Sequence, residues 1–309
     1  MGRRVQGVGI GLRRPLFDAL LASSRTVDWL ELVPENFVTH GGWRSRMLTA
    51  CAERWPLIAH GVSLSLGGPD ALNREYLVGL KRLLDQIDPP FFSEHLCWAS
   101  SDAHQFYDLL PLPFTEETVH WVAGRVRRVA DVIERPIVLE NITYYAVMPQ
   151  SSLSEGEFIR AVLEEGDAGL LLDVNNTYLN AVNHGRDPEA VLSELPLERT
   201  RQIHLAGYQV EEDGILLDHH GEPVADAVWD LYRLALQKVG PVPTLLEWDN
   251  NIPALDRVLD EADRARAIFE DVCRSACHDN AREPQPLVSS QDRVSVSDVG
   301  CRATPAPGS

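Results

Sequence analysis

The 309-residue sequence predicts a single-domain α/β protein with a (β/α)8 barrel, the TIM-barrel fold. Eight short apolar runs recur along the chain, and stretches with helical spacing of apolar residues lie between them. Nearly continuous apolar runs are typical of parallel strands that are buried on both faces. The chain length also matches that of one such barrel. The repeated alternation of strand and helix therefore favours a closed parallel sheet surrounded by helices.

The strands are predicted from the apolar runs, in chain order. Their ranges are 8–12, 29–33, 57–64, 91–98, 136–141, 170–176, 202–207 and 244–250. The segment GVGIG at residues 7–11, which overlaps the first run, is glycine-rich but lacks the GxGxxG spacing of a nucleotide-binding loop. We expect these glycines to permit close packing at the first strand.

The helices are predicted from amphipathic spacing and from residues that favour helix starts. Residues 70–87 place apolar side chains three and four positions apart. Thr115 precedes an acidic first turn, and Ser154 with Glu157 resembles a capping box. The predicted helical segments are 14–24, 43–54, 70–87, 115–134, 158–165, 223–238 and 253–274.

The C-terminal segment changes in composition. It is rich in Ser, Pro, Asp and Gly and shows little hydrophobic periodicity. Such segments bury too little apolar surface to offset the entropy of ordering. We therefore predict a barrel domain over residues 5–277 and a disordered tail over residues 278–309.

The overall composition excludes several classes of protein. A net charge of −18 repels phosphate backbones, so we expect no nucleic-acid partner. No apolar run approaches the roughly 20 residues that span a membrane, and the N-terminus lacks the apolar core of a secretory signal. We therefore expect a cytoplasmic protein. Five scattered cysteines without a CxxC pair argue against a disulfide framework or a zinc ribbon.

Metal-competent side chains recur at or near the ends of the predicted strands. Barrel enzymes assemble their sites at the C-terminal ends of the strands. Each residue alone has a structural alternative, such as a helix cap or a hydrogen-bonded core histidine. Burying all of them together is unfavourable unless they pair or bind metal. The candidates are Glu35, Asn36, His60, His95, Glu140, Asn141, Asp173, Asn175, Asn176, His204, Asp218, His220, Glu247 and Asp249.

The mixture of histidine and carboxylate constrains the metal. Imidazole and carboxylate together suit iron, manganese or catalytic zinc. A single octahedral ion with an open position cannot use so many ligands, so we expect two or three ions. Asp or Glu would supply the bridging ligands.

Several motifs occur in order and resemble one known family. They are GVGIGLR, ENF, SEHLCW, LENITYY, LLDVNN, IHLAG, the DHH loop and LLEWDNN. Together, over about residues 5 to 275, they resemble the multinuclear non-heme iron-dependent oxidative enzymes. That family includes the iron enzymes of methanobactin and bufferin maturation.

The resemblance implies a barrel with two or three irons in mixed Fe²⁺/Fe³⁺ states and dioxygen as co-substrate. It implies oxidation of cysteine residues in a ribosomally synthesised precursor peptide, helped by a small leader-recognition partner protein encoded nearby. Asp218 and His220 are also the candidate catalytic pair. Carried over by motif, the metal ligands would be His60, His95, Glu140, Asp173, His204, Asp218, His220 and Glu247, with Asn175 a further ligand.

The chain departs from the family pattern at two places. Tyr208 follows the IHLAG motif where many relatives carry histidine. The loop reads Asp218-His219-His220-Gly221 where Asp-Thr-His-Asp is common, but the Asp-x-His spacing is kept. Beside His95, the side chain of Glu94 should point to the opposite face of the strand, as a structural partner.

Two other classes of function remain open at this stage. One is a xylose-isomerase-like TIM-barrel metalloenzyme that uses Zn or Mn on a small sugar. The other is a metal-binding protein or scaffold without catalysis. Oxygen consumption with a cysteine-containing precursor peptide would separate these classes.

Overall fold

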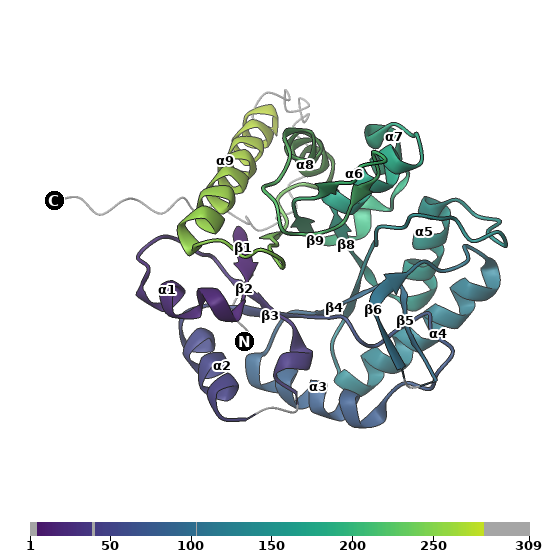
Figure 1. Cartoon of the computed structure of the whole chain (residues 1–309), viewed down its shortest axis with the longest axis horizontal. Coiled ribbons are helices and arrows are strands. Elements are labelled where there is room, and N and C mark those ends of the chain that lie inside the picture. The colour runs from purple at the N-terminus through teal and green to yellow at the C-terminus, as the bar shows by residue number, and fades with distance from the viewer. Residues whose placement is uncertain (1–4, 39–40, 103, 281–309) are drawn as a thin grey trace, which may run out of the picture.

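The computed structural model describes residues 5–38, 41–102 and 104–280, and it confirms the predicted barrel (Figure 1). Eight parallel strands close in the order β1-β12-β9-β8-β7-β4-β3-β2. Their bounds are β1 Val8–Gly11, β2 Leu30–Leu32, β3 Leu57–Gly61, β4 Phe92–His95, β7 Ile137–Glu140, β8 Gly169–Asp173, β9 Thr200–Leu205 and β12 Thr244–Leu246. Each strand lies within or overlaps one of the predicted apolar runs.

The register of the strands brings predicted ligands side by side. His95 at the end of β4 pairs with Glu140 at the end of β7. Asp173 at the end of β8 pairs with His204 in β9. Because the strands are parallel and in step, their C-terminal ends present these side chains at one end of the barrel.

The helices pack around the outside of the sheet, and most of the predicted ones are confirmed (Figure 1). The Thr115 side chain accepts from Thr118 N–H, and the predicted capping box of Ser154 and Glu157 is present. The α-helices are α1 Phe17–Ala22, α2 Trp43–Arg54, α3 Arg74–Ile87, α4 Glu116–Ile133, α5 Glu155–Gly166, α6 Val174–Asn183, α7 Pro188–Glu194, α8 Asp226–Val239 and α9 Leu255–Asn280. The 3-10 helices are η1 Arg14–Leu16, η2 Pro34–Asn36 and η3 Leu197–Arg199.

Every predicted strand ends one to four residues earlier than expected. The run 170–176 is strand only to Asp173, whose side chain accepts from Asn176 N–H at 2.7 Å and caps α6. Aspartate is a favourable residue for the start of a helix, so α6 begins here and the strand ends. The run 91–98 is strand only to His95, and Trp98 begins a separate hairpin. Helix α3 likewise starts late, because Asn73 rather than Asp70 provides its cap.

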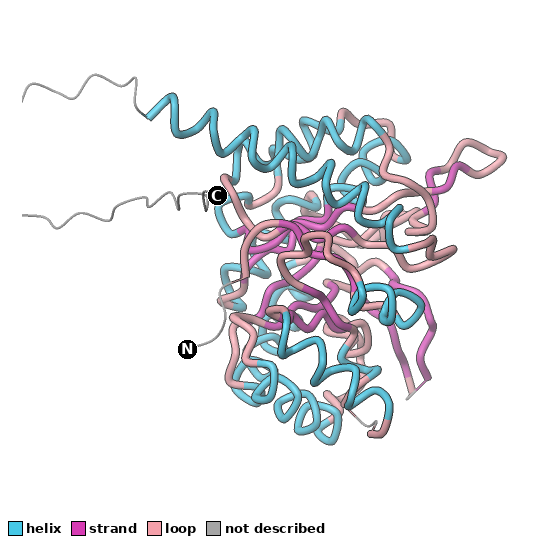
Figure 2. The backbone as a smooth tube through the Cα atoms, turned by 90° about the vertical axis from the view of Figure 1, so that its left-hand side faces the viewer, coloured by secondary structure: helices cyan, strands magenta, loops and turns pink. Residues whose placement is uncertain are grey.

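Two β-hairpins and helices α6 and α7 were not predicted. The first hairpin pairs β5 (Trp98–Ser101) with β6 (His104–Leu110), and the second pairs β10 (Gln209–Val210) with β11 (Leu216–Leu217). Both hairpins extend from the same end of the barrel (Figure 2). They are short polar-apolar insertions between a strand and the next helix, so their sequences resemble ordinary loops.

The remaining predictions on organisation concern the chain ends and membranes. Helix α9 continues past residue 277 to Asn280, and the rest of the predicted tail lies outside the described residues. None of the described helices is long and apolar enough to cross a membrane.

The described part of the chain has three apolar clusters, the smallest of which is Cys97, Ala99 and Ile142. The largest cluster fills the space between the sheet and the helices, and the second lies inside the barrel. Gly9 of β1 makes room for that inner cluster, since a Cβ atom there would lie 2.5 Å from the Trp29 ring. The expected close packing at the first strand is therefore confirmed. The inner cluster consists of Val5, Trp29, Ile58, Phe91, Val138, Leu171 and Leu245.

Candidate metal centre

The candidate site is built on top of the inner apolar cluster. Every second residue of a strand faces the barrel interior. At five strands, an apolar residue of the inner cluster is followed two positions later by an inward-facing polar residue that is at most 7% exposed. A layer of ionisable side chains, called the ionisable layer below, therefore lies directly above the inner apolar cluster. The paired positions are Trp29 and Glu31, Ile58 and His60, Val138 and Glu140, Leu171 and Asp173, and Leu245 and Glu247.

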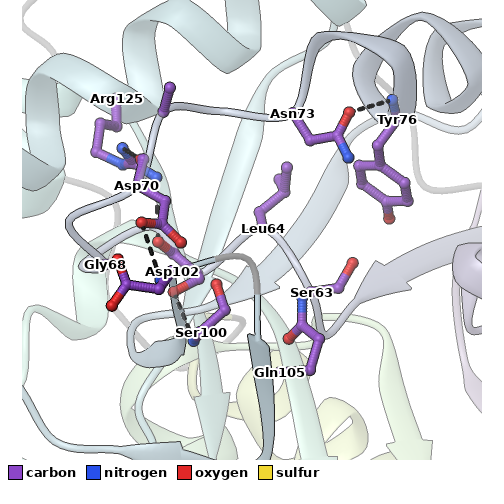
Figure 3. Close-up of a pocket in the computed structure, with 12 residues that line it drawn as sticks. Ser63, Leu64, Gly68, Asp70, Asn73, Tyr76, Ser100, Asp102, Gln105 and Arg125 are labelled. Atoms are coloured by element: carbon purple, nitrogen blue, oxygen red, sulfur yellow. Dashed lines mark hydrogen bonds between the residues drawn. The ribbon is translucent and has the colours of Figure 1, made fainter.

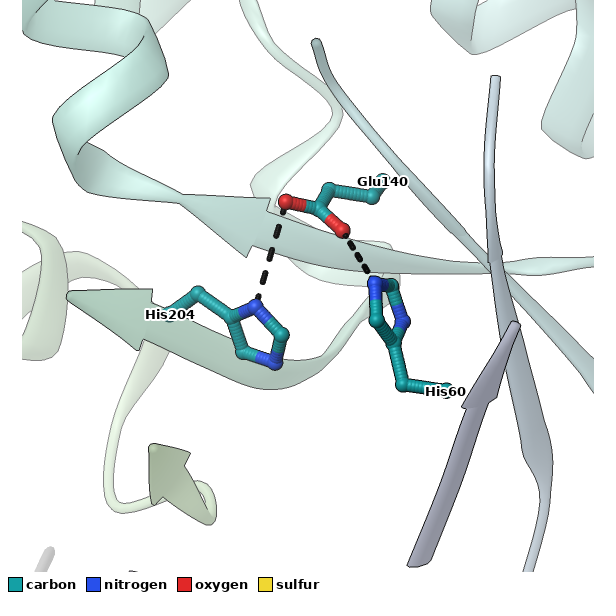
Figure 4. Close-up of side chains that lie close together, drawn as sticks. All are labelled: His60, Glu140 and His204. Carbon is teal, nitrogen blue, oxygen red and sulfur yellow. Dashed lines mark ion pairs between the residues drawn. The ribbon is translucent and has the colours of Figure 1, made fainter. Parts of the chain in front are cut away.

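Glu140 lies at the centre of one half of the ionisable layer. Its Oε2 is 3.0 Å from His60 Nε2 and 3.3 Å from His95 Nε2, and its Oε1 is 3.8 Å from His204 Nδ1. Figure 4 shows the side chains of His60, Glu140 and His204 pointing toward one another from separate strands. Ser93 and the Gly61 carbonyl contact the remaining ring nitrogens of His60 and His95 at 3.0 and 2.9 Å. These contacts hold both rings with Nε2 toward the carboxylate.

His204 links this half to a deeper carboxylate. Its Nε2 lies 3.2 Å from Glu31 Oε2, to which the Gln202 amide also donates at 2.6 Å. Its Nδ1 faces Glu247 Oε2 at 3.2 Å. A carboxylate next to one ring nitrogen favours the proton there and leaves the other nitrogen free to bind metal. Glu31 is therefore placed to orient His204 with Nδ1 toward the cluster.

The other half of the layer lies nearer the surface. His220 Nε2 lies 2.7 Å from Asp218 Oδ1, and that oxygen accepts a hydrogen bond from Asn175 Nδ2 at 3.0 Å. His220 Nδ1 faces Glu247 Oε2 at 3.7 Å. Asp173 lies beneath this group and uses only Oδ1 to cap α6. Glu247 is thus shared between His204 and His220, as a bridging ligand would be.

The charges of the cluster depend on one another. Burial disfavours ionisation of Glu140, yet His95 and His60 hold its pKa at about 2. Burial and Asp249 oppose ionisation of Glu247, yet His220 and His204 hold its pKa at about 2. Burial lowers the pKa of His95, but Glu140 and Glu94 outweigh burial and raise it to about 9. The raised pKa of His95 means that this histidine carries a balancing proton near neutral pH, and a cation that binds would displace it.

Several buried atoms of the cluster suit a metal better than they suit each other. Although the closest contacts are near 3 Å, some of these atoms lack any hydrogen-bond partner in the described part of the chain. Buried polar groups are rarely left unpaired, and an absent ion is one reason for the exceptions. Ligand atoms that face a common metal position would be left without hydrogen-bond partners in this way. The unpartnered atoms are Glu140 Oε2, Asp173 Oδ2, Asn175 Oδ1, His204 Nδ1 and His220 Nε2.

The spacing of these atoms fits more than one ion. Three groups of ligand atoms each lie within 4.8 Å of one another. His204 and Glu247 each belong to two of them, so neighbouring ions would share ligands. The groups are His60, Glu140 and His204; Glu31, His204 and Glu247; and Asp173, His220 and Glu247. No thiolate is among them, and the donor set is that of iron, manganese or catalytic zinc.

All nine metal ligands that the sequence suggested lie in or beside this cluster. Glu94, as expected, faces away: it accepts from the backbone N–H groups of Leu64 and His95 at 3.2 and 3.0 Å. Asn141 ties β7 to the start of α6 through Asp173. The backbone carbonyl of Asn36 accepts from Arg44 at 2.9 Å, and Tyr208 stacks on Tyr178.

Three contributors were missed from the sequence, namely Glu31, Gln202 and Arg13. The predicted ligands lie at or near strand ends, whereas Glu31 lies in mid-strand. Inward alternation would have found it, because Glu31 stands two positions after Trp29 as His60 stands after Ile58. Arg13 donates to both Glu247 and Asp249 from the loop after β1.

A cleft of about 820 Å³ opens the cluster to solvent. His60, His95, His220 and Glu247 reach its surface on one side. The opposite wall is largely apolar and comes from the two hairpins and the loop after β7. That wall includes Ala99, Leu109, Leu110, Pro111, Tyr144, Tyr145, Ala146 and Leu217.

A second cavity of about 610 Å³ adjoins the cleft (Figure 3). Ser63 and Gln105 line both spaces. Its wall is more polar, with Asn73 and Tyr76 on one side. Arg125 closes it by donating to the carbonyl oxygens of Asp70 and Ser65 at 2.6 and 3.2 Å. The surface available to a bound molecule therefore extends beyond the cluster itself.

Glu155 supports the cleft from outside the cluster and should make stability depend on pH. Burial raises its pKa to about 7, although hydrogen bonds from Tyr144 and Asn180 lower it. Because the pKa of Glu155 is higher in the folded than in the unfolded chain, its contribution to the free energy of unfolding is full below about pH 4.5. That contribution is lost as the pH rises through 7. Relative to wild type, Glu155→Gln should gain about 2 kcal/mol of unfolding free energy between pH 5 and 8. Urea unfolding at both pH values measures this. An equal difference at both would contradict it.

Comparison with known proteins places the chain among related sequences. The family described as "RiPP precursor modification enzyme MbnB/TglH/ChrH" matches residues 7–270. A UPF0276 protein of Acaryochloris marina is 46% identical over 261 residues, covering 84% of this chain and 94% of the relative. A UPF0276 protein of Pseudomonas aeruginosa is 45% identical over 265 residues, covering 85% and 93%.

Solved structures share the fold at low sequence identity. A xylose isomerase-like TIM barrel protein from Mycobacterium smegmatis, in complex with magnesium, aligns with a TM-score of 0.56 at 12% identity, over 87% of this chain and 98% of that one. Endonuclease IV from Thermus thermophilus also aligns with a TM-score of 0.56, at 14% identity, over 86% and 99%. At these identities the likeness concerns the barrel alone.

Proposed function

Because the chain belongs to the family of RiPP precursor modification enzymes that includes MbnB, TglH and ChrH, we propose that it is an iron-dependent oxidase of peptide cysteines. It would use dioxygen to modify cysteine residues of a ribosomally synthesised precursor peptide. We propose two or three irons in mixed Fe²⁺/Fe³⁺ states. The observation that carries the proposal is the buried layer of His and carboxylate side chains, which contains unpartnered atoms and is exposed in part to a cleft through His60, His95, His220 and Glu247.

The positions of the candidate ligands suggest which residues would hold each ion. His60, His95 and Glu140 would hold one, and His204, Glu247, Asp173 and His220 would hold the others, with Asp218 and Asn175 beside them. When bound, iron supplies the electron transfer and the dioxygen chemistry that amino-acid side chains lack. Asp218 and His220 would form the catalytic pair, because they lie at the rim where a bound peptide meets the cluster.

The chain itself would position the peptide. A cysteine side chain reaching the base of the cleft would face the histidines, while flanking residues lie against the apolar wall. The size of the cleft falls in the usual range of about 300–1,000 Å³ for ligand sites. We further propose a cytoplasmic enzyme, acting where the precursor is made, with a small leader-recognition partner protein encoded nearby.

Tyr145 should matter for turnover, although half of it is exposed. Its hydroxyl accepts from the backbone N–H of Asp218 at 3.0 Å and so ties the Asp218 loop to the loop after β7. Removing one such hydrogen bond costs about 0.5–1.5 kcal/mol. Tyr145→Phe should therefore lower kcat for the peptide several-fold at unchanged iron content and with little change in Tm. An unchanged kcat would show that this bond does not position Asp218.

Metal analysis combined with a peptide assay tests the proposal. The protein is purified without oxygen, loaded with Fe²⁺, Mn²⁺ or Zn²⁺, and mixed in air with a cysteine-containing precursor and the partner protein. We expect a change in peptide mass at cysteine with iron only. Peptide modification by iron-free protein, or epimerisation of a small sugar with Mn²⁺ and none of the peptide, would reject the proposal.

A further inference from the structure

The geometry points to Arg13 as the positioning residue that aims Glu247 at the metals. Arg13 lies in the loop after β1, the one barrel strand that offers no candidate ligand. Among the described residues, it is the one lysine or arginine that lines the cleft. Its side chain is 14% exposed and is surrounded by the acids of the cluster.

Arg13 binds one oxygen of Glu247 and leaves the other facing the histidines of the cluster. Its Nη2 donates to Glu247 Oε1 at 3.3 Å. The other oxygen, Oε2, is left facing His204 Nδ1 at 3.2 Å and His220 Nδ1 at 3.7 Å. With Oε1 engaged, Glu247 can offer the cluster only Oε2, in a fixed direction.

The same guanidinium group anchors the His220 side of the cluster. Arg13 Nε donates to Asp249 Oδ1 at 2.7 Å, and Asp249 Oδ2 lies 3.6 Å from His220 Nδ1. The planar fork of arginine suits two carboxylates at once, which a lysine ammonium does not.

Gly11 provides independent support for this placement. A Cβ atom at Gly11 would lie 2.8 Å from Arg13 Nη1 and 2.9 Å from its Cζ. The guanidinium therefore lies against a bare backbone, and a side chain at residue 11 would displace it. The position of the Arg13 guanidinium group therefore depends on the absence of a side chain at Gly11 as well as on its own rotamer.

Arg13 thus decides whether the ions that share Glu247 are held. We expect Arg13→Met to lower affinity for those ions by roughly 10- to 100-fold, the usual effect of losing a partner that orients a ligand. The ion at His60, His95 and Glu140 should remain. Arg13→Lys keeps the charge without the fork and should fall between. Gly11→Ala keeps the arginine but moves it, and should weaken the same ions.

The experiment measures iron bound per chain in anaerobic Fe²⁺ titrations, with Mössbauer spectra to resolve the individual ions. Arg266→Met is the matched control, since Arg266 is also partly buried (19% exposed) and bridges Asp28 and Asp263 away from the cleft. Because the inference rests on the metal centre of the proposed function, wild type is titrated first. Absence of iron binding by wild type would reject the proposed function. Normal iron binding by wild type together with unchanged ions in folded Arg13→Met, or in Gly11→Ala if Arg13→Met does not fold, would overturn the role of Arg13 alone.

Discussion

Glu140→Gln is expected to remove the ion held by His60 and His95 and to abolish peptide modification. Among the residues that the structure describes, Glu140 is the one carboxylate whose two oxygens face three histidines. An amide lacks the charge that balances a cation, and its nitrogen would point a donor at a metal. The loss of iron affinity should exceed the roughly 10- to 100-fold that follows loss of an outer partner.

Iron content, measured after anaerobic loading and gel filtration, tests this expectation. Glu155→Gln is the matched control, because it makes the same change at a buried glutamate outside the cluster. That control should keep both its iron and its activity. If Glu140→Gln bound the full number of irons and modified the peptide at the normal rate, Glu140 would not be a ligand.

Glu31→Gln is expected to weaken iron binding without removing a binding position. Glu31 is 2% exposed and lies 3.2 Å from His204 Nε2, on the side of the ring away from the cluster. Without its charge, His204 is held less firmly with Nδ1 toward the metals. Affinity should fall by roughly 10- to 100-fold, while saturating iron restores the full number of ions.

Titration of iron at low and at saturating concentrations distinguishes the two possible roles of Glu31. A reduced number of ions at saturation would make Glu31 a direct ligand instead of an orienting partner. Glu261→Gln on α9, another buried glutamate, should bind iron as wild type does.

The barrel could be predicted because its signals are local. Apolar runs and capping residues such as Ser154 report on their own neighbourhood. The proximity of the candidate ligands at the ends of β3, β4, β7 and β8 could be predicted because parallel strands bring their ends together. The start of α6 could have been predicted as well, since Asp173 is a good cap, but the apolar run masked it.

The missed features depend on contacts between distant segments. Arg13 reaches Glu247 and Asp249 across the junction between the first and last strands of the barrel. Nothing in the local sequence of Arg13 indicates that contact. The hairpins that wall the cleft are short and poorly distinguished from loops. Glu31 differs from these features, because the alternation along its own strand marks it as inward-facing although it does not lie at a strand end.

Glu94 and His95 show how strand geometry separates neighbouring residues. His95 faces the cluster, and Glu94 binds the backbone on the other side of the strand. Both are largely buried and ionisable, and residue type alone would rank them together. Alternation correctly assigns the histidine to the site and the glutamate to its support.

Dioxygen uptake during peptide modification tests the central claim most directly. Iron-loaded protein is mixed with the precursor peptide and the partner protein in an oxygen electrode, and peptide masses are followed in parallel. We predict uptake that requires both iron and cysteine, proportional to the modified peptide, and absent when each cysteine is replaced by serine. Peptide modification at full rate without dioxygen, or equal uptake with the serine peptide, would contradict the account.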